Sequence, residues 1–245
     1  MGMAMDDAVI SYPGRPLAKS QGLSEHVYQA LLQMLVQGLL KRGTVLRIDL
    51  LAKTLDVSPT PVREALARLA TTGLVLHEPR KGYTIAPPID SKQLAELMDA
   101  RRLIEVAAIG RACANGGPAF VRSLEKALDV QRDAVSAYQA QARADNPELA
   151  WAVMLADLKF HQTIFDHTGN RFIGVMAQAL SAQLHRIRQS AQAGISDDRN
   201  AIEEHETILA AVRQGDCQAA EQAMKNHIDN VETRSELDLT EDHPN

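Results

Sequence analysis

Four residues in the C-terminal half of the chain have the types and spacing that a metal site needs: Asp157, His161, His205 and His227. The first two are four residues apart, so on a helix they would lie one turn apart on the same face. The two later histidines are 22 residues apart, on either side of a turn predicted at Gly215-Asp216. An antiparallel helix hairpin would bring them to the same level. Three imidazoles and one carboxylate suit a borderline divalent ion such as Zn, Ni, Mn or Fe.

Spacing alone leaves other interpretations of this set open. Histidines on helices commonly serve as hydrogen-bonded core residues or lie on the surface. A metalloenzyme could use the same ligands. The chain has no His-Glu-x-x-His motif, no nucleophile motif and no evident general base, so the sequence offers an enzyme little else.

A second group of residues has the chemistry of DNA recognition. Residues 58–64 have the sequence SPTPVRE, and Arg63 could bond both O6 and N7 of a guanine if this segment opened a recognition helix. Further candidates for base or phosphate contacts are Ser58, Thr60, Arg68, Arg80, Lys81 and Gly82. The competing interpretation is a solvated basic helix whose Val62, Leu66 and Leu69 are ordinary core residues.

The charge distribution agrees with DNA binding by one part of the chain. The net charge is -5, yet residues 41–82 contain eight Lys or Arg against four Asp or Glu, a net of +4. Residues 83–245 carry the acidic excess. Because phosphate contacts supply much of the affinity for DNA, a basic segment beside an acidic remainder favours a single DNA-binding module.

The N-terminal elements have the order of a winged helix-turn-helix. Apolar spacing predicts a first helix over 23–36 with Ser24 as its N-cap, a short second helix over 48–55, and a third that opens at Thr60. Pro61 suits the first turn of this third helix, and Gly73 suits its end. Residues 74–77 and 83–86 are β-prone, and the connection between them contains Gly82, which can take a positive φ, so we expect a hairpin.

The rest of the chain is predicted to be all α. Pro87-Pro88 marks a boundary, and turn signals divide residues 91–236 into six amphipathic helices of roughly 18 to 26 residues. We therefore expect a mainly α protein with four parts: a disordered arm over 1–22, a winged helix-turn-helix over 23–88, a six-helix bundle over 91–236 and a frayed tail over 237–245.

Composition favours a cytoplasmic protein. No apolar run approaches the roughly 20 residues of a membrane span, so we expect no membrane partner, and the N-terminus lacks the apolar core of a secretory signal. Cys113 and Cys217 share no short spacing, which argues against a disulfide framework or a cysteine zinc site. We expect both to be buried thiols.

The stretch from Gln29 to Val75, with PVREAL followed by GLV, resembles the GntR family of transcription regulators, and the resemblance covers about residues 23–88. It implies a DNA-binding regulator rather than an enzyme. Two residues depart from the family pattern. Pro59 stands where members usually carry a DNA-contacting arginine, and Asp49 stands where some use another, so the resemblance implies the fold more firmly than the operator sequence.

The segment LMDARRLIEVAA and the helices after it resemble the six-helix variety of the FCD effector domain, which responds to carboxylated metabolites. Asp157, His161, His205 and His227 match the metal-binding pattern of that domain, which implies a divalent ion, zinc first among the candidates. His167 and His185 have no counterpart in that pattern, so we expect them to be ordinary core or surface residues. Arg101 matches an arginine that faces the same cavity and would pair with a ligand carboxylate. Its alternative is a salt bridge with Glu105.

Together these features predict a homodimer that presents two recognition helices to the half-sites of a palindromic operator. A small organic acid bound at the metal would favour one arrangement of the effector domains and so change the affinity for the operator. We expect the protein to act as a repressor. A purely structural metal is the remaining alternative, with the effector contacting protein groups alone.

Overall fold

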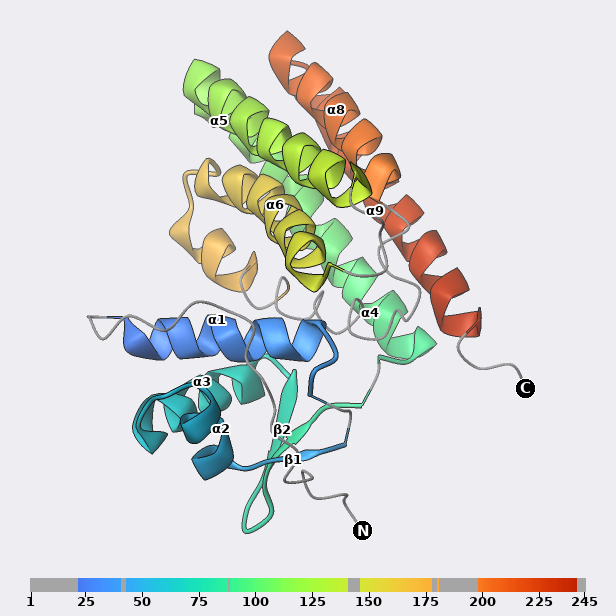
Figure 1. Ribbon diagram of the computed structural model, residues 1–245. Coiled ribbons are helices and arrows are strands. Elements are labelled where there is room, and N and C mark those ends of the chain that lie inside the picture. The colour runs from blue at the N-terminus through green and yellow to red at the C-terminus, as the bar shows by residue number, and fades with distance from the viewer. Residues whose placement is uncertain are drawn as a thin grey trace. The chain divides into compact units, whose positions relative to one another are not determined.

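The protein is described from a computed structural model that covers residues 22–40, 43–87, 89–140, 146–177, 180 and 198–241 (Figure 1). The chain divides into two compact units, one ending at Pro88 and the other beginning at Ile89. Each unit is described by itself. The arm predicted for residues 1–22 lies outside the described residues except for Gly22.

Three helices form most of the first unit: α1 (Leu23–Val36), α2 (Ile48–Thr54) and α3 (Pro59–Thr71). Their apolar faces are buried against one another through residues such as Leu31, Leu66 and Leu69, all fully buried. The predicted N-cap was wrong. Gly22 occupies that position, with φ 117°, and the Ser24 hydroxyl instead donates to a Glu64 carboxylate oxygen at 2.7 Å, which links α1 to α3.

A small antiparallel sheet completes this unit, in the order β1 (Val45–Leu46), β3 (Gly82–Ile85) and β2 (Val75–Glu78). The hairpin of β2 and β3 confirms the predicted wing, and Gly82 has the positive φ, 87°, that its tip requires. The sequence did not predict β1. Two residues are too few for a periodic signal, and this strand is defined only by its pairing with β3.

The second unit is helical. Its elements are α4 (Ser91–Arg101), the π-helical turn η1 (Arg102–Val106), α5 (Ala107–Ala140), α6 (Pro147–Asp166), helical residues 171–177, α8 (Asp198–Gln214) and α9 (Cys217–Glu241). The predicted break near residue 117 is a kink inside α5, where Gly117 alone leaves helical geometry, with φ 53° and ψ -157°. The predicted break near residue 195 lies outside the described residues.

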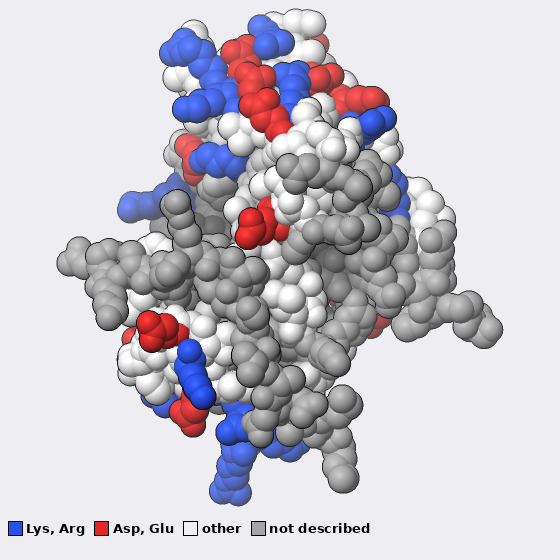
Figure 2. All heavy atoms as spheres, in the orientation of Figure 1, with Lys and Arg blue, Asp and Glu red and all other residues white. Residues whose placement is uncertain are grey.

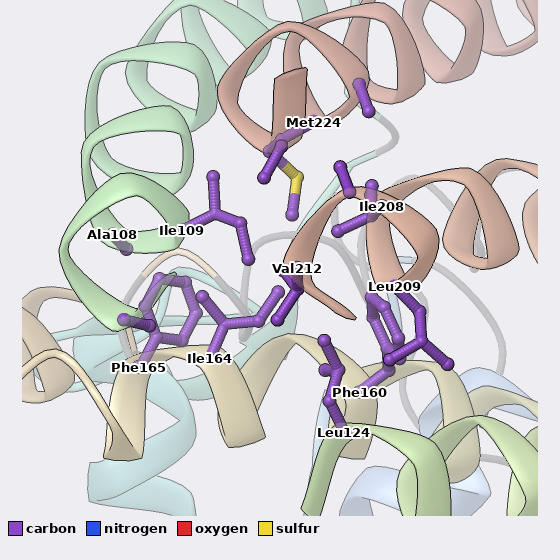
Figure 3. Close-up of a cluster of buried hydrophobic side chains, with 14 of the residues drawn as sticks. Ala108, Ile109, Leu124, Phe160, Ile164, Phe165, Ile208, Leu209, Val212 and Met224 are labelled. Atoms are coloured by element: carbon purple, nitrogen blue, oxygen red, sulfur yellow. The ribbon is translucent and has the colours of Figure 1, made fainter. Parts of the chain in front are cut away.

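The core of this unit is a cluster of apolar side chains from the long helices (Figure 3). Leu124 of α5, Phe160 of α6, Ile208 of α8 and Met224 of α9 are all buried there. The mainly α architecture predicted from the sequence is confirmed. The tail prediction was wrong for residues 237–241, because α9 continues through Glu241. Among the described helices, none combines the length and the hydropathy that crossing a membrane would require.

The expectation of two buried thiols was also wrong. The structure joins Cys113 of α5 to Cys217 of α9 in a disulfide, with the two Cα atoms 5.5 Å apart. Both residues are only partly buried. Their sequence separation of 104 concealed the pairing, because it depends on how α5 and α9 pack rather than on any local spacing.

Candidate metal centre and nucleic-acid interface

Three histidines from three helices meet inside the second unit. His161 of α6, His205 of α8 and His227 of α9 are 3%, 0% and 2% exposed. Each offers one ligand atom, and these atoms all lie within 4.8 Å of one another. The ring of Phe160 stacks on His205 with centroids 3.9 Å apart, which holds that imidazole in place. The structure thus brings together the histidines that the sequence singled out.

An oxygen atom of a polar side chain lies beside the Nδ1 nitrogen of each ring. Nδ1 of His161 lies 2.7 Å from Glu105, that of His205 lies 2.7 Å from Gln131, and that of His227 lies 2.7 Å from Glu204. His161 Nδ1 lies within ion-pair distance of Glu105 but has no hydrogen bond among the described residues. Carboxylate and amide oxygens only accept hydrogen bonds, so Nδ1 carries the proton in His205 and His227 and their Nε2 atoms keep the lone pair. This is the arrangement by which proteins orient histidines that bind metals.

The Nε2 atom of His205 tests whether a metal fits here. It is buried and has no hydrogen-bond partner within the part of the chain that the structure describes. Leaving a buried acceptor unsatisfied is unfavourable, so an electrophile is its natural partner. Three imidazoles that each bring a ligand atom within 4.8 Å of the others are a donor set that suits a divalent ion such as Zn²⁺.

The protonation behaviour of the rings agrees with that donor set. Burial lowers the pKa of His205 well below its usual value, and the neighbouring His227 and His161 lower it further. Burial also lowers the pKa of His227, although its hydrogen bond to Glu204 opposes the shift. Both rings are therefore neutral near pH 7, which is the form that binds metal.

Asp157, the fourth predicted ligand, lies one turn before His161 on α6 and is 8% exposed. Its Oδ1 accepts a hydrogen bond from Gln131 Nε2 at 3.3 Å. It is not among the residues whose ligand atoms lie within 4.8 Å of one another. Asp157 is therefore linked to the histidines through Gln131, which also hydrogen-bonds to His205.

Arg101 forms the ion pair that the sequence offered as its alternative role. Its Nε lies 2.6 Å from Glu105 Oε1, and both side chains are almost completely buried. Burial raises the pKa of Glu105, but Arg101 and His161 lower it more, so the net pKa lies well below the usual value. Glu105 thus stays ionised between a guanidinium and an imidazole.

Sequence reasoning missed the partners of the histidines as site residues. Glu105 was noted only as the neighbour of Arg101, and its position in a π-helical turn, a feature common at functional sites, was not predicted. Gln131 and Glu204 belong to no motif. Burial raises the pKa of Glu204, but hydrogen bonds from His227 and Arg234 lower it to about 2. Only the long-range packing of α5, α8 and α9 reveals these partners.

Among the described histidines, His167 does not belong to this cluster. His167 lies at the end of α6, where its Nδ1 contacts the Thr163 carbonyl oxygen at 2.8 Å and its ring packs on Phe120. His185 lies outside the described residues.

The first unit exposes the start of α3. Ser58, Thr60 and Arg63 are all exposed, while Val62, Leu66 and Leu69 are buried on the opposite face. Among the described residues, Arg63 has no hydrogen-bond or ion-pair partner. An exposed guanidinium in the first turns of the second helix of a helix-turn-helix has the position of a base-reading residue.

Arg68 has a different environment from Arg63. Its NH1 lies 2.6 Å from Glu25 Oε2, and its guanidinium lies 4.1 Å from the centre of the Tyr28 ring. Both contacts tie α3 to α1. They favour a packing role for Arg68, the alternative that the sequence had left open.

The tip of the β2–β3 hairpin is basic. Figure 2 shows Lys and Arg side chains gathered at that end of the first unit. Arg80 is exposed with φ 69°, and exposed Lys81 lies 2.6 Å from Glu78. Gly82 follows at the start of β3. This surface could reach DNA backbone or minor groove next to the helix that bears Arg63.

Comparison with protein families gives a match for each unit. Residues 96–230 match the model described as FCD domain, and residues 23–85 match the model described as bacterial regulatory proteins, gntR family. The first match covers more than half of the chain.

Individual relatives agree over nearly the whole length. The chain is 26% identical over 237 residues to the gluconate operon transcriptional repressor of Bacillus subtilis (strain 168), covering 95% of this chain and 92% of that protein. It is 27% identical over 215 residues to the HTH-type transcriptional repressor RspR of Escherichia coli (strain K12), covering 88% and 90%. Among solved structures, E. coli McbR/YncC has a similar fold, with a TM-score of 0.71 at 23% identity, covering 89% of this chain and 99% of that one.

Proposed function

This chain belongs to the GntR family of bacterial regulatory proteins, in the group with an FCD domain, and on that premise we propose that it is a metal-dependent, metabolite-responsive repressor. It is a DNA-binding transcription regulator of that type, and its relatives are regulators rather than enzymes. The proposal adds a divalent metal in the helical unit, a small carboxylate effector bound at that metal, and a homodimer that binds a palindromic operator.

The observation that carries the metal proposal is the buried Nε2 of His205, which has no hydrogen-bond partner among the described residues and belongs to a ring close to the imidazoles of His161 and His227. His161, His205 and His227 would hold the ion, and Asp157 is the nearest carboxylate candidate for a fourth ligand. A bound Zn²⁺ would supply Lewis-acid coordination positions that an effector carboxylate could occupy.

Arg101 is our candidate for recognising the effector's charge. Its guanidinium is buried near the histidines, but Nε and one terminal nitrogen already donate hydrogen bonds to the Glu105 carboxylate, at 2.6 and 3.5 Å. An incoming carboxylate would therefore share Arg101 with Glu105 rather than meet a free cation. Because Glu105 also contacts His161, effector binding at Arg101 would act directly on a proposed metal ligand.

The proposed DNA contacts centre on Arg63, with Ser58 and Thr60 at the start of the same helix and Arg80, Lys81 and Gly82 in the wing. Support comes from their exposure and from the absence of competing partners for Arg63 among the described residues. Pairing of two chains would present two copies of α3 to successive major grooves.

The two roles of the metal can be separated by one experiment. Metal-free protein, prepared with a chelator, is titrated with zinc while circular dichroism follows its fold. Gel shifts with a duplex selected from a randomised library by this protein then measure DNA affinity with and without a panel of hydroxy, sugar and dicarboxylic acids.

We expect the metal-free protein to stay folded and to lose its response to the active acid. Unfolding on metal removal would instead favour a purely structural metal. A protein that binds no zinc, or whose DNA affinity no acid changes, would contradict the proposal.

A further inference from the structure

Gln131 of α5 connects two of the proposed metal ligands. It is 1% exposed, and its two amide ends point to different partners. Its Oε1 lies 2.7 Å from His205 Nδ1, and its Nε2 lies 3.3 Å from Asp157 Oδ1. We propose that Gln131 is a positioning residue that sets the tautomer of His205 and the orientation of Asp157 at once.

The chemistry of the amide makes this double role specific. A carboxylate such as Asp157 only accepts hydrogen bonds, so the NH₂ end of Gln131 must face it. The amide oxygen then faces His205, and its neighbour Nδ1 must carry the proton. That tautomer places the lone pair on Nε2, the buried atom without a partner in the described part of the chain.

No other residue type of similar size supplies both functions. Glutamate would keep the acceptor for His205 but would set a second negative charge against Asp157. Methionine would fill the same volume with neither function. Gln131→Glu therefore keeps the hydrogen-bond acceptor, whereas Gln131→Met keeps only the volume of the side chain. Comparing the two variants separates the effect of the acceptor from the effect of the volume.

The inference rests on the proposed metal site, but its first test needs no metal. In the metal-free, ¹⁵N-labelled full chain, long-range proton–nitrogen correlation spectra report which ring nitrogen of His205 is protonated. We expect the Nδ1–H form in the wild type, retention of that form in Gln131→Glu, and a mixture of tautomers in Gln131→Met. Gln139→Met, on the same helix but bonded to Arg199, is the matched control and should keep the wild-type spectrum.

Zinc titration gives the second measurement. Loss of a residue that orients a metal ligand typically weakens metal binding by about 10- to 100-fold, and we expect that loss for Gln131→Met but not for Gln139→Met. A fixed Nδ1–H tautomer in Gln131→Met, together with wild-type zinc affinity, would overturn the assignment. A wild-type chain that binds no zinc would instead overturn the metal proposal, and the tautomer measurement would still decide the role of Gln131.

The disulfide carries a second and independent inference. Bacterial transcription regulators meet their DNA where thiol reductants keep most cysteines reduced, and disulfides formed there are generally transient. Cys113 and Cys217 are both partly exposed, so small oxidants and reductants can reach them. We propose that they form a reversible redox pair that fastens α5 to α9 after reaction with a hydroperoxide.

The helix contact beside the pair explains how the bond can form again after reduction. One turn before Cys113, Gly110 faces Glu221, which lies one turn after Cys217, and a Cβ at Gly110 would come within 1.9 Å of the Glu221 carboxylate. The absence of a side chain at Gly110 lets α5 and α9 approach closely. This contact lies one turn from the disulfide on both helices, and in the reduced protein it would keep the two thiols within reach.

The chemical step needs only the peroxide. One thiolate attacks a peroxide oxygen, the O–O bond breaks, and a sulfenic acid and one water form. The second thiol then attacks that sulfur, the S–S bond forms, and a second water leaves. Two thiols and one hydrogen peroxide thus yield one disulfide and two waters.

Alkylation followed by intact-mass measurement tests the pair on the full chain. We expect two alkylated thiols after dithiothreitol, none after peroxide, and two again when dithiothreitol is returned. The oxidised protein should melt several degrees above the reduced one, because the bond closes a long loop. Cys113→Ser should melt at one temperature in both conditions. Two free thiols after peroxide, or a bond that joins separate chains, would overturn the proposal.

Discussion

The two units expose their functional chemistry in opposite ways. In the first unit, Arg63 is exposed and unengaged among the described residues, and neighbouring buried residues such as Leu66 belong to the core. In the second unit, the proposed ligands are themselves core: His205 is fully buried and stacked on Phe160. A surface that binds a large polyanion needs accessible cations, whereas a metal site needs ligands that surrounding contacts hold rigidly. Substitution of an exposed, unengaged residue such as Arg63 should therefore affect binding alone, whereas substitution of a buried ligand candidate such as His205 should affect binding together with stability.

The largest effect should come from the buried charge pair. Glu105→Ala would leave Arg101 buried without its counter-ion, and breaking such a pair costs about 3–5 kcal/mol. Urea denaturation measures this change. The matched control is Glu206→Ala, which breaks an exposed pair with Arg132 and should cost less than about 1 kcal/mol. Equal losses of unfolding free energy in the two variants would contradict the claim that the buried pair contributes more to stability than the exposed pair.

The next effect concerns metal affinity. Replacing an orienting residue typically weakens metal binding by about 10- to 100-fold, so loss of a ligand should weaken it by at least about 100-fold. We expect this for His205→Ala in calorimetric titration with zinc. His167→Ala changes a histidine of the same unit that hydrogen-bonds to a backbone carbonyl, and should leave zinc affinity unchanged. A similar loss in both variants would contradict the assignment of ligands.

The DNA surface should respond without a change in stability. Arg63→Ala removes an exposed side chain, and loss of one bidentate base contact costs about 1–3 kcal/mol, or roughly 5- to 150-fold in affinity. Gel shift on the selected duplex measures the affinity, and thermal melting should match the wild type. An unchanged affinity would contradict the assignment of Arg63 as the base-contacting residue.

The smallest effect is expected at Arg68. This residue tests whether the first unit contains both a packing arginine, Arg68, and a DNA-contacting arginine, Arg63. Arg68→Ala removes the exposed ion pair with Glu25 and the contact with Tyr28, together worth about 1–2 kcal/mol of stability. Denaturation of the first unit should detect this loss, while affinity for the selected duplex should fall less than in Arg63→Ala. The reverse order of DNA affinities would show that Arg68 contacts DNA.

The sequence predicted the elements with strong local signals. Residues 23–36 were predicted as a helix, and α1 has those bounds, because apolar residues recur there at helical spacing. The wing was predicted from two β-prone stretches and a glycine. By contrast, the two-residue β1 has no periodicity, and Ser24 has the residue type of an N-cap but bonds across to α3 instead.

The histidines of the candidate site were predictable from the sequence, but their surroundings were not. His161, His205 and His227 stand at spacings that a helical hairpin converts into proximity. Gln131 lies 74 residues from His205, and the two cysteines lie 104 residues apart, so their contacts arise only when the helices pack. Polar residues that support a site have no periodic pattern of their own, so they could not be predicted from the sequence.

X-ray absorption at the zinc edge, on protein reloaded with one zinc per chain, tests the central claim most directly. The proposed centre predicts nitrogen and oxygen neighbours at about 2.0–2.1 Å, with the outer-shell scattering of three imidazoles. That scattering should fall by one imidazole in His205→Ala and remain unchanged in His167→Ala. A sulfur shell, fewer than three imidazoles in the wild type, or a spectrum that His205→Ala leaves unchanged would contradict the claim that these buried histidines form a metal centre.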